Sequence, residues 1–295
     1  MQLTKDKQIL IVGLGLLGGS YAEGLTESGY TVGAIDVSRE SIALALSRGI
    51  IAHGEVTVHP SYVGQFDIVI LALYPEGAVQ WMRDYQHLLK PNAIITDVTG
   101  VKCPVLYPIQ SFLREDLEMI GAHPMAGKER SGVTFADAKM LRGANYIITP
   151  TTKNTQRAIT LCRELGEALG FGTITCLSPE EHDEMIGFLS QLTHCIAVSL
   201  MTSRDTASFV DYSGDSFRDL TRIAKINEHM WSQLFLANKE PLLRQMDLFL
   251  EQFSRLRKSL ADGRVEDMKD MMRLSTKQRE AFDIPTKAKQ GESKL

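Results

Sequence analysis

Short apolar runs alternate with amphipathic stretches through about the first 175 residues. The apolar runs predict strands over 8–12, 30–35, 67–73, 93–96, 118–122, 146–149 and 172–177. Between them, helical spacing and capping residues predict helices over 16–28, 39–48, 75–90, 101–115 and 154–169. The run 67–73 is apolar almost throughout, as expected for a parallel strand that is covered on both faces. This half of the chain therefore predicts an α/β fold with a doubly wound parallel sheet, whose ligands bind outside the carboxyl ends of the strands.

The pattern changes at Ser178-Pro-Glu-Glu181. A serine N-cap, a proline in the first turn and a glutamate three residues after the serine predict a helix start. No strand pattern follows, so we expect domains at 1–178 (sheet) and 179–285 (helical), and a disordered tail over 286–295. The helices are predicted over 179–204, 214–226, 228–260 and 263–282. An apolar stripe along the first of them favours burial against a second copy of the chain, and a homodimer is expected; its residues are Met185, Leu189, Leu192, Ile196 and Leu200.

Composition narrows the class of protein. The 295 residues have 44% hydrophobic content, 23% charged residues and a net charge of −4, which is typical of a soluble globular protein and argues against a nucleic-acid partner. No signal peptide or membrane-length apolar stretch is evident, so we expect a cytoplasmic protein that does not bind a membrane. The four cysteines are widely spaced, which favours reduced thiols over disulfides or a metal site.

A glycine-rich turn follows the first predicted strand. Residues 13–18 read Gly-Leu-Gly-Leu-Leu-Gly, and Asp36 ends the next apolar run. This is the dinucleotide-binding fingerprint of a Rossmann-type domain, in which glycines and a helix N-terminus receive the pyrophosphate. The predicted cofactor-binding residues are Gly13, Gly15, Leu16, Leu17, Gly18, Asp36 and Arg39. The Asp36 carboxylate favours NAD, whereas the nearby Arg39 keeps NADP as the alternative. The chain is therefore expected to be an oxidoreductase.

Three further groups of residues are candidates for chemistry. His123, held extended by Pro124 at a strand end, is placed to take a proton from a substrate hydroxyl, although an isolated His-Pro more often satisfies loop backbone. Ser190 and His194 share one helix face and are candidates for a binding site. A histidine that simply lies on the helix surface is an equally good interpretation. Arg218, Arg222 and Lys225 recur on one helical face and would bind a carboxylate near a cofactor, whereas alone such a face is usually solvated.

Taken together, these motifs resemble the prephenate/arogenate dehydrogenase family of tyrosine biosynthesis. The resemblance runs from residue 8 to about 245 and rests on blocks at 13–20, 97–102, 123–132, 178–182, 190–194 and 217–225, followed by Met230-Trp231. The blocks that begin His123-Pro-Met-Ala-Gly and Phe217-Arg-Asp-Leu-Thr-Arg are the specific ones.

The resemblance implies the roles of several residues. It makes His123 the catalytic histidine that hydrogen-bonds the ring hydroxyl, and Arg222 the arginine that holds a substrate carboxylate. It places His194 in the substrate pocket and Glu129 near the pocket mouth. It also implies oxidative decarboxylation of prephenate by a dimer that associates through its helical domain. With Ser190, Lys225 and Thr99, these residues form the expected substrate site.

Two positions depart from the family pattern. Gly100 stands where many members have a serine that orients the histidine and the substrate hydroxyl, and Thr99 is the candidate replacement. Gln191 stands where some members have a histidine.

The sequence is compatible with other functions. The substrate is prephenate or arogenate. A dinucleotide sensor without turnover is the alternative from another class, and a 3-hydroxyacid dehydrogenase is disfavoured because no comparable lysine setting is found in the second domain. We expect no chorismate mutase segment before residue 8 and no regulatory domain after residue 282.

Overall fold

The computed structural model describes residues 2–128 and 130–283. The first part of the chain is an eight-stranded sheet with strand order β3-β2-β1-β4-β5-β6-β7-β8. The strands are β1 (Gln8–Val12), β2 (Thr31–Ile35), β3 (His53–Glu55), β4 (Ile68–Leu71), β5 (Ile94–Asp97), β6 (Glu118–Pro124), β7 (Asn145–Thr149) and β8 (Thr173–Cys176). The order places β1 and β4 side by side where the chain reverses its direction of winding, which is the usual ligand-binding position in such sheets.

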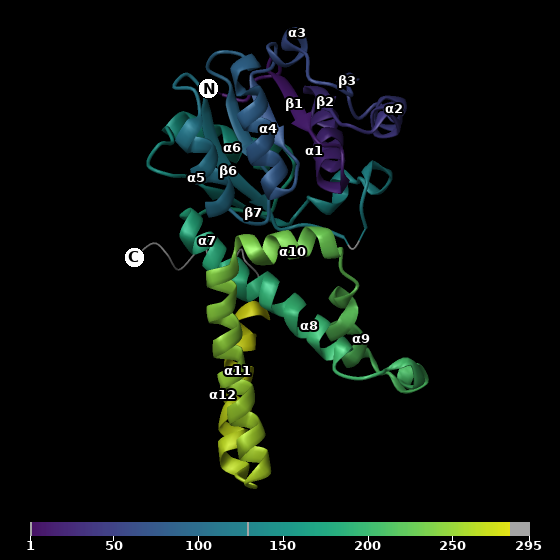
Figure 1. The fold of residues 1–295 in the computed structure, drawn as a ribbon, viewed down its shortest axis with the longest axis vertical. Coiled ribbons are helices and arrows are strands. Elements are labelled where there is room, and N and C mark those ends of the chain that lie inside the picture. Colours follow the sequence, from purple (N-terminus) through teal and green to yellow (C-terminus); the bar gives the residue numbers. More distant parts are fainter. Residues whose placement is uncertain (1, 129, 284–295) are drawn as a thin grey trace. The chain divides into compact units, whose positions relative to one another are not determined.

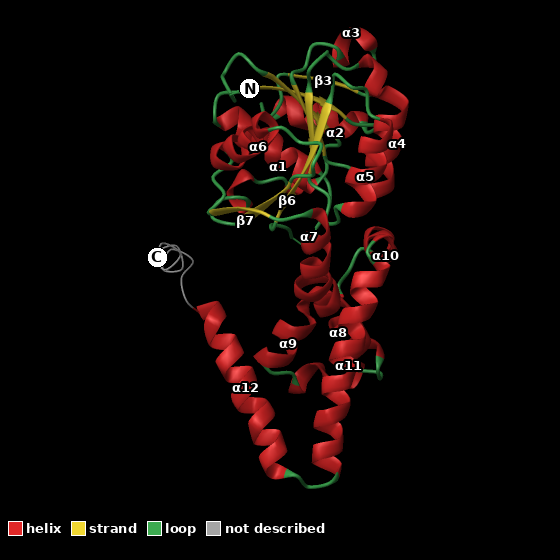
Figure 2. Ribbon diagram, turned by 90° about the vertical axis from the view of Figure 1, so that its left-hand side faces the viewer, coloured by secondary structure: helices red, strands yellow, loops and turns green. Residues whose placement is uncertain are grey.

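Helices cover both faces of this sheet, as Figure 2 shows. Side chains of β1 alternate between two cores: Ile9 and Ile11 face one, Leu10 and Val12 the other. The first core is completed by α1 (Leu16–Glu27), α2 (Arg39–Ser47) and α6 (Gln156–Ala168), and the second by α3 (Pro60–Val63), α4 (Pro75–Tyr85) and α5 (Cys103–Phe112). The predicted α/β fold and its layers are confirmed.

The sheet differs from the prediction in two respects. The strand β7 runs antiparallel to β6, with His123 paired to Ile147, so the sheet is mixed at this edge. The segment that joins these strands contains short turns in place of a full helix, Val133–Phe135 and Ala138–Met140, and the chain therefore reverses without a right-handed crossover. The elements β3 and α3 were not predicted because both are only three or four residues long.

The helical half begins as predicted at Ser178. The Ser178 hydroxyl accepts the Glu181 amide, and the Glu181 carboxylate accepts the Ser178 amide, which is a complete capping box. The helix from Pro179 to Thr202 consists of α7 (Pro179–Ile186), a π-helical segment (Gly187–Leu192) and α8 (Thr193–Thr202). This is the one helix of the described chain that is long and apolar enough to cross a membrane by length and composition alone, so the prediction that no apolar stretch reaches membrane length is wrong by this criterion. The core helix of a soluble protein meets the same two criteria.

The predicted helix over 228–260 is wrong as a single element. It is divided into α10 (Glu228–Ala237) and α11 (Lys239–Ala261) at Asn238. Pro241 explains the break, because it has no N–H to donate to the carbonyl of Ala237, and its ring crowds that carbonyl. The remaining elements are a 3-10 segment (Ala207–Tyr212), α9 (Asp215–Thr221), the 3-10 turn η6 (Arg222–Ala224) and α12 (Val265–Asp283).

The chain forms two compact units, one up to Lys239 and one from Glu240 (Figure 1). The second unit consists of α11 and α12, joined by a turn in which Gly263 has φ +65°. Many of its large apolar side chains are exposed, namely Leu243, Leu248, Leu250, Phe253, Leu260, Val265, Met272, Leu274 and Phe282. Such a surface is unusual for a protein that stays monomeric. The predicted tail over 286–295 lies outside the described residues.

Candidate active site

The glycine turn has the geometry that a dinucleotide requires. Gly13 adopts φ +96°, and a Cβ atom there would lie 2.5 Å from the carbonyl oxygen of Ala72. A Cβ atom on Gly18 would lie 1.9 Å from the Gly13 carbonyl oxygen, so α1 packs closely on the turn only because residue 18 is glycine. At Gly15, in contrast, a Cβ atom would meet open space. The three glycines thus divide into one for the turn, one for the approach of a ligand and one for helix packing.

The start of α1 is available to an anion. The helix begins at Leu16, and its N-cap residue, Gly15, has no side chain to cap this end. First-turn N–H groups, including those of Leu16 and Leu17, have no partner within the helix, and together with the helix dipole they attract negative charge. These residues fit the pyrophosphate of a dinucleotide, which supplies hydride-transfer chemistry when it is bound.

Asp36 lies directly beside this turn. One of its oxygens, Oδ2, accepts the amide of Leu14 at 2.6 Å, and Oδ1 accepts the amide of Ser38 at 2.8 Å. The two contacts fix the carboxylate at the carboxyl end of β2, with further lone pairs for ribose hydroxyls. Arg39 is exposed in the first turn of α2, next to the exposed Glu40.

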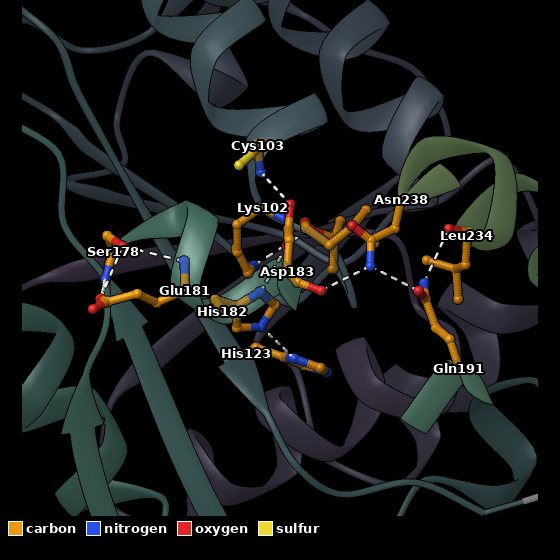
Figure 3. Close-up of polar contacts among 12 residues, drawn as sticks. Lys102, Cys103, His123, Ser178, Glu181, His182, Asp183, Gln191, Leu234 and Asn238 are labelled. Carbon is orange, nitrogen blue, oxygen red and sulfur yellow. Dashed lines mark hydrogen bonds and ion pairs between the residues drawn. The ribbon is translucent and has the colours of Figure 1, made fainter. Parts of the chain in front are cut away.

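His123 lies near the end of β6 and makes its contact with the helical half (Figure 3). Its Nδ1 is 2.8 Å from Nε2 of His182, and the two rings meet edge to face at 64°. Its Nε2 has no hydrogen-bond partner within residues 2–128 and 130–283. Desolvation lowers the pKa of His123 well below 6.5, and the nearby His182 and Lys102 lower it further. The ring is therefore neutral at physiological pH, with one nitrogen anchored.

His182 is completely buried and is held in turn by Asp183. Its Nδ1 lies 2.8 Å from Asp183 Oδ1. Burial lowers the pKa of His182, and the hydrogen bond to Asp183 opposes this shift only in part. Asp183 itself accepts the amides of Lys102 at 2.7 Å and Cys103 at 2.8 Å, at the N-terminal end of α5. Neither His182 nor Asp183 was predicted to have a role, although residues 178–182 form one of the blocks of the resemblance.

A buried ion pair lies beneath His123. Lys102 Nζ is 2.7 Å from Asp97 Oδ2, and both side chains are fully shielded from solvent. The same ammonium donates to the carbonyl oxygen of Ala122 at 2.6 Å, so it holds the residue that precedes His123. Burial lowers the pKa of Lys102, and Asp97 opposes that shift. Both residues are in the quoted block 97–102, yet neither was predicted to act in the site.

Gly100 faces the anchored histidine. A Cβ atom at this position would lie 3.9 Å from His123 Nε2 and 3.5 Å from a methyl group of Leu234, so there is room for a serine. The Thr99 hydroxyl instead lies within hydrogen-bond distance of two acceptors, the Asp97 carboxylate and the Val101 carbonyl oxygen, and it accepts from Lys102 Nζ. These contacts direct Thr99 into the protein and argue against the prediction that it replaces the missing serine.

Gln191 joins the same network from the π-helical segment. Its amide donates to the Leu234 carbonyl at 3.0 Å and accepts from Asn238 at 2.7 Å. Asn238 also donates to the Asp183 carbonyl at 2.8 Å. The side chain at the break between α10 and α11 thus fixes α7, which carries His182 (Figure 3).

His194 and Ser190 lie together as their spacing predicts. His194 Nδ1 donates a hydrogen bond to the Ser190 carbonyl oxygen at 2.8 Å. The ring also lies over Trp231 of α10, with 3.7 Å between centroids. Both His194 and Ser190 are half-buried.

The basic residues do not share one continuous helix. Arg218 is in α9, where it makes exposed contacts with Ser213 and Asp215, and α9 ends at Thr221. Arg222 is exposed in η6, which packs against α8, and Lys225 follows in extended conformation. The predicted single helical face is therefore wrong for Arg222 and Lys225. Glu129 lies outside the described residues.

The glycine turn, Asp36 and the anchored His123 together define a class of protein. It is that of the two-domain dinucleotide-binding oxidoreductases. The family model described as the nucleotide-binding domain of prephenate dehydrogenase matches residues 21–174, and the model of its dimerisation domain matches 178–274. The chain belongs to the prephenate dehydrogenase family.

Individual relatives agree with this assignment. The chain is 31% identical to prephenate dehydrogenase of Bacillus subtilis (strain 168) over 87% of its own length and 71% of that protein's. It is 29% identical to cyclohexadienyl dehydrogenase of Zymomonas mobilis over 88% and 90% of the two chains. The crystal structure of prephenate dehydrogenase from A. aeolicus, in complex with hydroxyphenyl propionate and NAD+, superposes with a TM-score of 0.86 at 29% identity, covering 95% of this chain and all of that one.

Proposed function

We propose that this protein is an NAD-dependent prephenate dehydrogenase that converts prephenate to 4-hydroxyphenylpyruvate and carbon dioxide. The observation that carries the proposal is the neutral His123, with Nδ1 anchored and Nε2 free of partners in the described chain. It lies at the carboxyl edge of a sheet whose glycine turn fits a dinucleotide. Family membership and the relatives support prephenate as the substrate.

In this proposal the protein's residues bind the substrate and move one proton. Arg222 and Lys225 hold the carboxylates of the dianionic substrate, and His194 with Ser190 lines the pocket. A bound NAD would supply the acceptor for the hydride that leaves C4 of the ring. His123 Nε2 takes the proton of the ring hydroxyl, and the bond between the ring and its carboxylate breaks, so that carbon dioxide leaves and the electron pair of that bond makes the ring aromatic. The phenolate so formed takes the proton back from His123, and the proton balance closes.

Initial rates with prephenate and arogenate, each paired with NAD and NADP, test the proposal directly. We expect the highest kcat/KM with prephenate and NAD. Turnover with arogenate alone would keep the mechanism and change the substrate, a possibility that the cyclohexadienyl dehydrogenase relative keeps in view. Cofactor binding without turnover of any pair would replace the proposal by the dinucleotide-sensor function.

The preference for NAD over NADP is proposed to arise at Asp36. Replacing Asp36 by Asn removes the charge that repels a 2′-phosphate and weakens the hydrogen bonds to the ribose. We expect kcat/KM with NAD to fall about 10- to 100-fold, since a hydrogen bond to a charged group contributes about 1.5–3 kcal/mol. The ratio of NADP to NAD use should rise in steady-state assays.

Glu40→Gln is the matched control for this variant. It makes the same change of charge at an exposed carboxylate four residues away. An equal change of cofactor preference in both variants would assign the selectivity to the overall negative charge near the start of α2 and not to Asp36.

We propose a homodimer that forms through the helical residues after the domain boundary near 178. The exposed apolar side chains of α11 and α12 support this, as does the match of 178–274 to a dimerisation domain. Sedimentation velocity on the full chain should show a species of about twice 32.8 kDa. A cytoplasmic location is part of the same proposal.

A further inference from the structure

We propose that His182 and Asp183 are positioning residues that fix the tautomer of His123, so that its unprotonated Nε2 faces the substrate hydroxyl. The inference rests on the proposed function and extends it by two residues. A series of hydrogen bonds leads from Asp183 through His182 to His123 (Figure 3).

Asp183 determines which group donates and which accepts in this series of hydrogen bonds. Its two oxygens accept the backbone amides of Lys102 and Cys103, and a carboxylate offers acceptors only. The nitrogen that faces it, Nδ1 of His182, must therefore carry the hydrogen. The helix N-terminus at α5 supports the negative charge of this carboxylate.

The hydrogen on His182 then determines the tautomer of both imidazole rings. A neutral imidazole has one N–H, so a hydrogen on Nδ1 of His182 leaves its Nε2 as an acceptor. The partner of that acceptor, Nδ1 of His123, must donate. Its other nitrogen, Nε2, then holds the lone pair that a general base needs. Burial lowers the pKa of both histidines, which keeps both rings in the neutral form that this assignment requires.

The same hydrogen bonds stabilise the His123 cation that proton transfer produces. When Nε2 of His123 takes the hydroxyl proton, the ring becomes a cation whose Nδ1–H points toward His182 and, beyond it, toward the Asp183 carboxylate. A base that is oriented by a second group, itself oriented by a third, is the usual arrangement for efficient proton abstraction. Lys102 and Asp97 also face this cluster, and their opposite charges are paired with each other.

Direct measurement of the tautomers tests the assignment without any substrate. In protein labelled with 15N-histidine, long-range proton–nitrogen correlation at pH 8 should show His123 and His182 with hydrogen on Nδ1 and a lone pair on Nε2. His123→Asn and His182→Asn assign the two signals by their loss. Hydrogen on Nε2 of His123 would overturn the proposal, whatever the enzyme's substrate proves to be.

Two substitutions of His182 distinguish a role in orienting His123 from a role only in stabilising the fold. The amide of Asn superposes roughly on Nδ1, so His182→Asn keeps the contact to Asp183 and loses the one to His123. Gln reaches the position of Nε2, so His182→Gln keeps an acceptor for His123 and loses Asp183. We expect His182→Asn to lower kcat about 10- to 100-fold, as part of the roughly 10²- to 10⁴-fold that a general base contributes, with KM and the Kd of NAD unchanged.

The Gln variant should retain more of the activity than the Asn variant. A purely structural role predicts the reverse order, because Asn preserves the link to the anchored Asp183. That reverse order, or equal kcat in both variants at comparable Tm, would overturn the positioning role. If wild-type protein turns over neither prephenate nor arogenate, the proposed function fails while the tautomer measurement still decides this inference.

Discussion

His123→Asn is expected to abolish nearly all turnover while the protein still binds NAD. The asparagine amide can reach the position of Nδ1 and keep a contact with His182, but nothing takes the place of Nε2 as the base. A general base contributes about 10²- to 10⁴-fold, and kcat should fall by that factor. The dinucleotide turn is built from other residues, so the Kd of NAD, measured by fluorescence titration, should not change.

The pH dependence of the native enzyme provides a second measure of the same group. His123 must be neutral to accept a proton, and its pKa lies well below 6.5 because the ring is desolvated and faces His182 and Lys102. The value of kcat/KM should therefore stay level as pH falls to about 6.5 and decrease only below that, as the ring becomes protonated.

His87→Asn is the matched control for these measurements, because His87 is exposed in a turn after α4. It should keep native kinetics. A His123→Asn enzyme with native kcat would remove His123 from the mechanism and leave the geometry of this site without a base.

The sequence predicted the sheet and the cofactor turn because both depend on local patterns. Glycines at 13, 15 and 18 and an acid at 36 are interpretable without knowledge of their distant neighbours. The structure gives a steric reason for Gly13 and Gly18 and leaves open space at Gly15. The capping box at Ser178 was predictable for the same reason. Short apolar runs and the 3.6-residue helical period likewise predicted most of the strands and helices of the first half.

The support of His123 could not be predicted in this way. Lys102 and Asp183 are 81 residues apart in sequence, and no local pattern indicates that one amide meets the other's carboxylate. The signals that were present lay inside motifs used only for the resemblance: His182 in block 178–182 and Lys102 in block 97–102. The break at Asn238 has a local signal in Pro241, which was not used in predicting a single helix over 228–260.

The buried Lys102–Asp97 ion pair fixes the backbone next to His123, because Lys102 Nζ also donates to the Ala122 carbonyl oxygen. Lys102 bridges Asp97 on β5 and the Ala122 carbonyl on β6, so one ammonium fixes the ends of two adjacent strands. Removing one charge of a fully buried pair leaves the other without compensation, and such losses cost about 3–5 kcal/mol. We therefore expect Lys102→Met to lower the free energy of unfolding by that amount, measured by urea denaturation.

Lys128→Met is the control, because the Lys128–Asp137 pair is 3.2 Å long but about 40% exposed on both sides. Exposed pairs contribute about 0–1 kcal/mol, so this variant should unfold near the native urea concentration.

A double variant distinguishes the two causes of the loss. In Asp97→Asn with Lys102→Met no charge is left unpaired, and much of the stability should return if the penalty arises from the isolated carboxylate. Activity should not return with it, because neither methionine nor asparagine donates to the Ala122 carbonyl as the ammonium does. Stability that stays at the level of Lys102→Met would instead assign the loss to the missing Ala122 contact and to packing, and the ion pair would then contribute little to the fold.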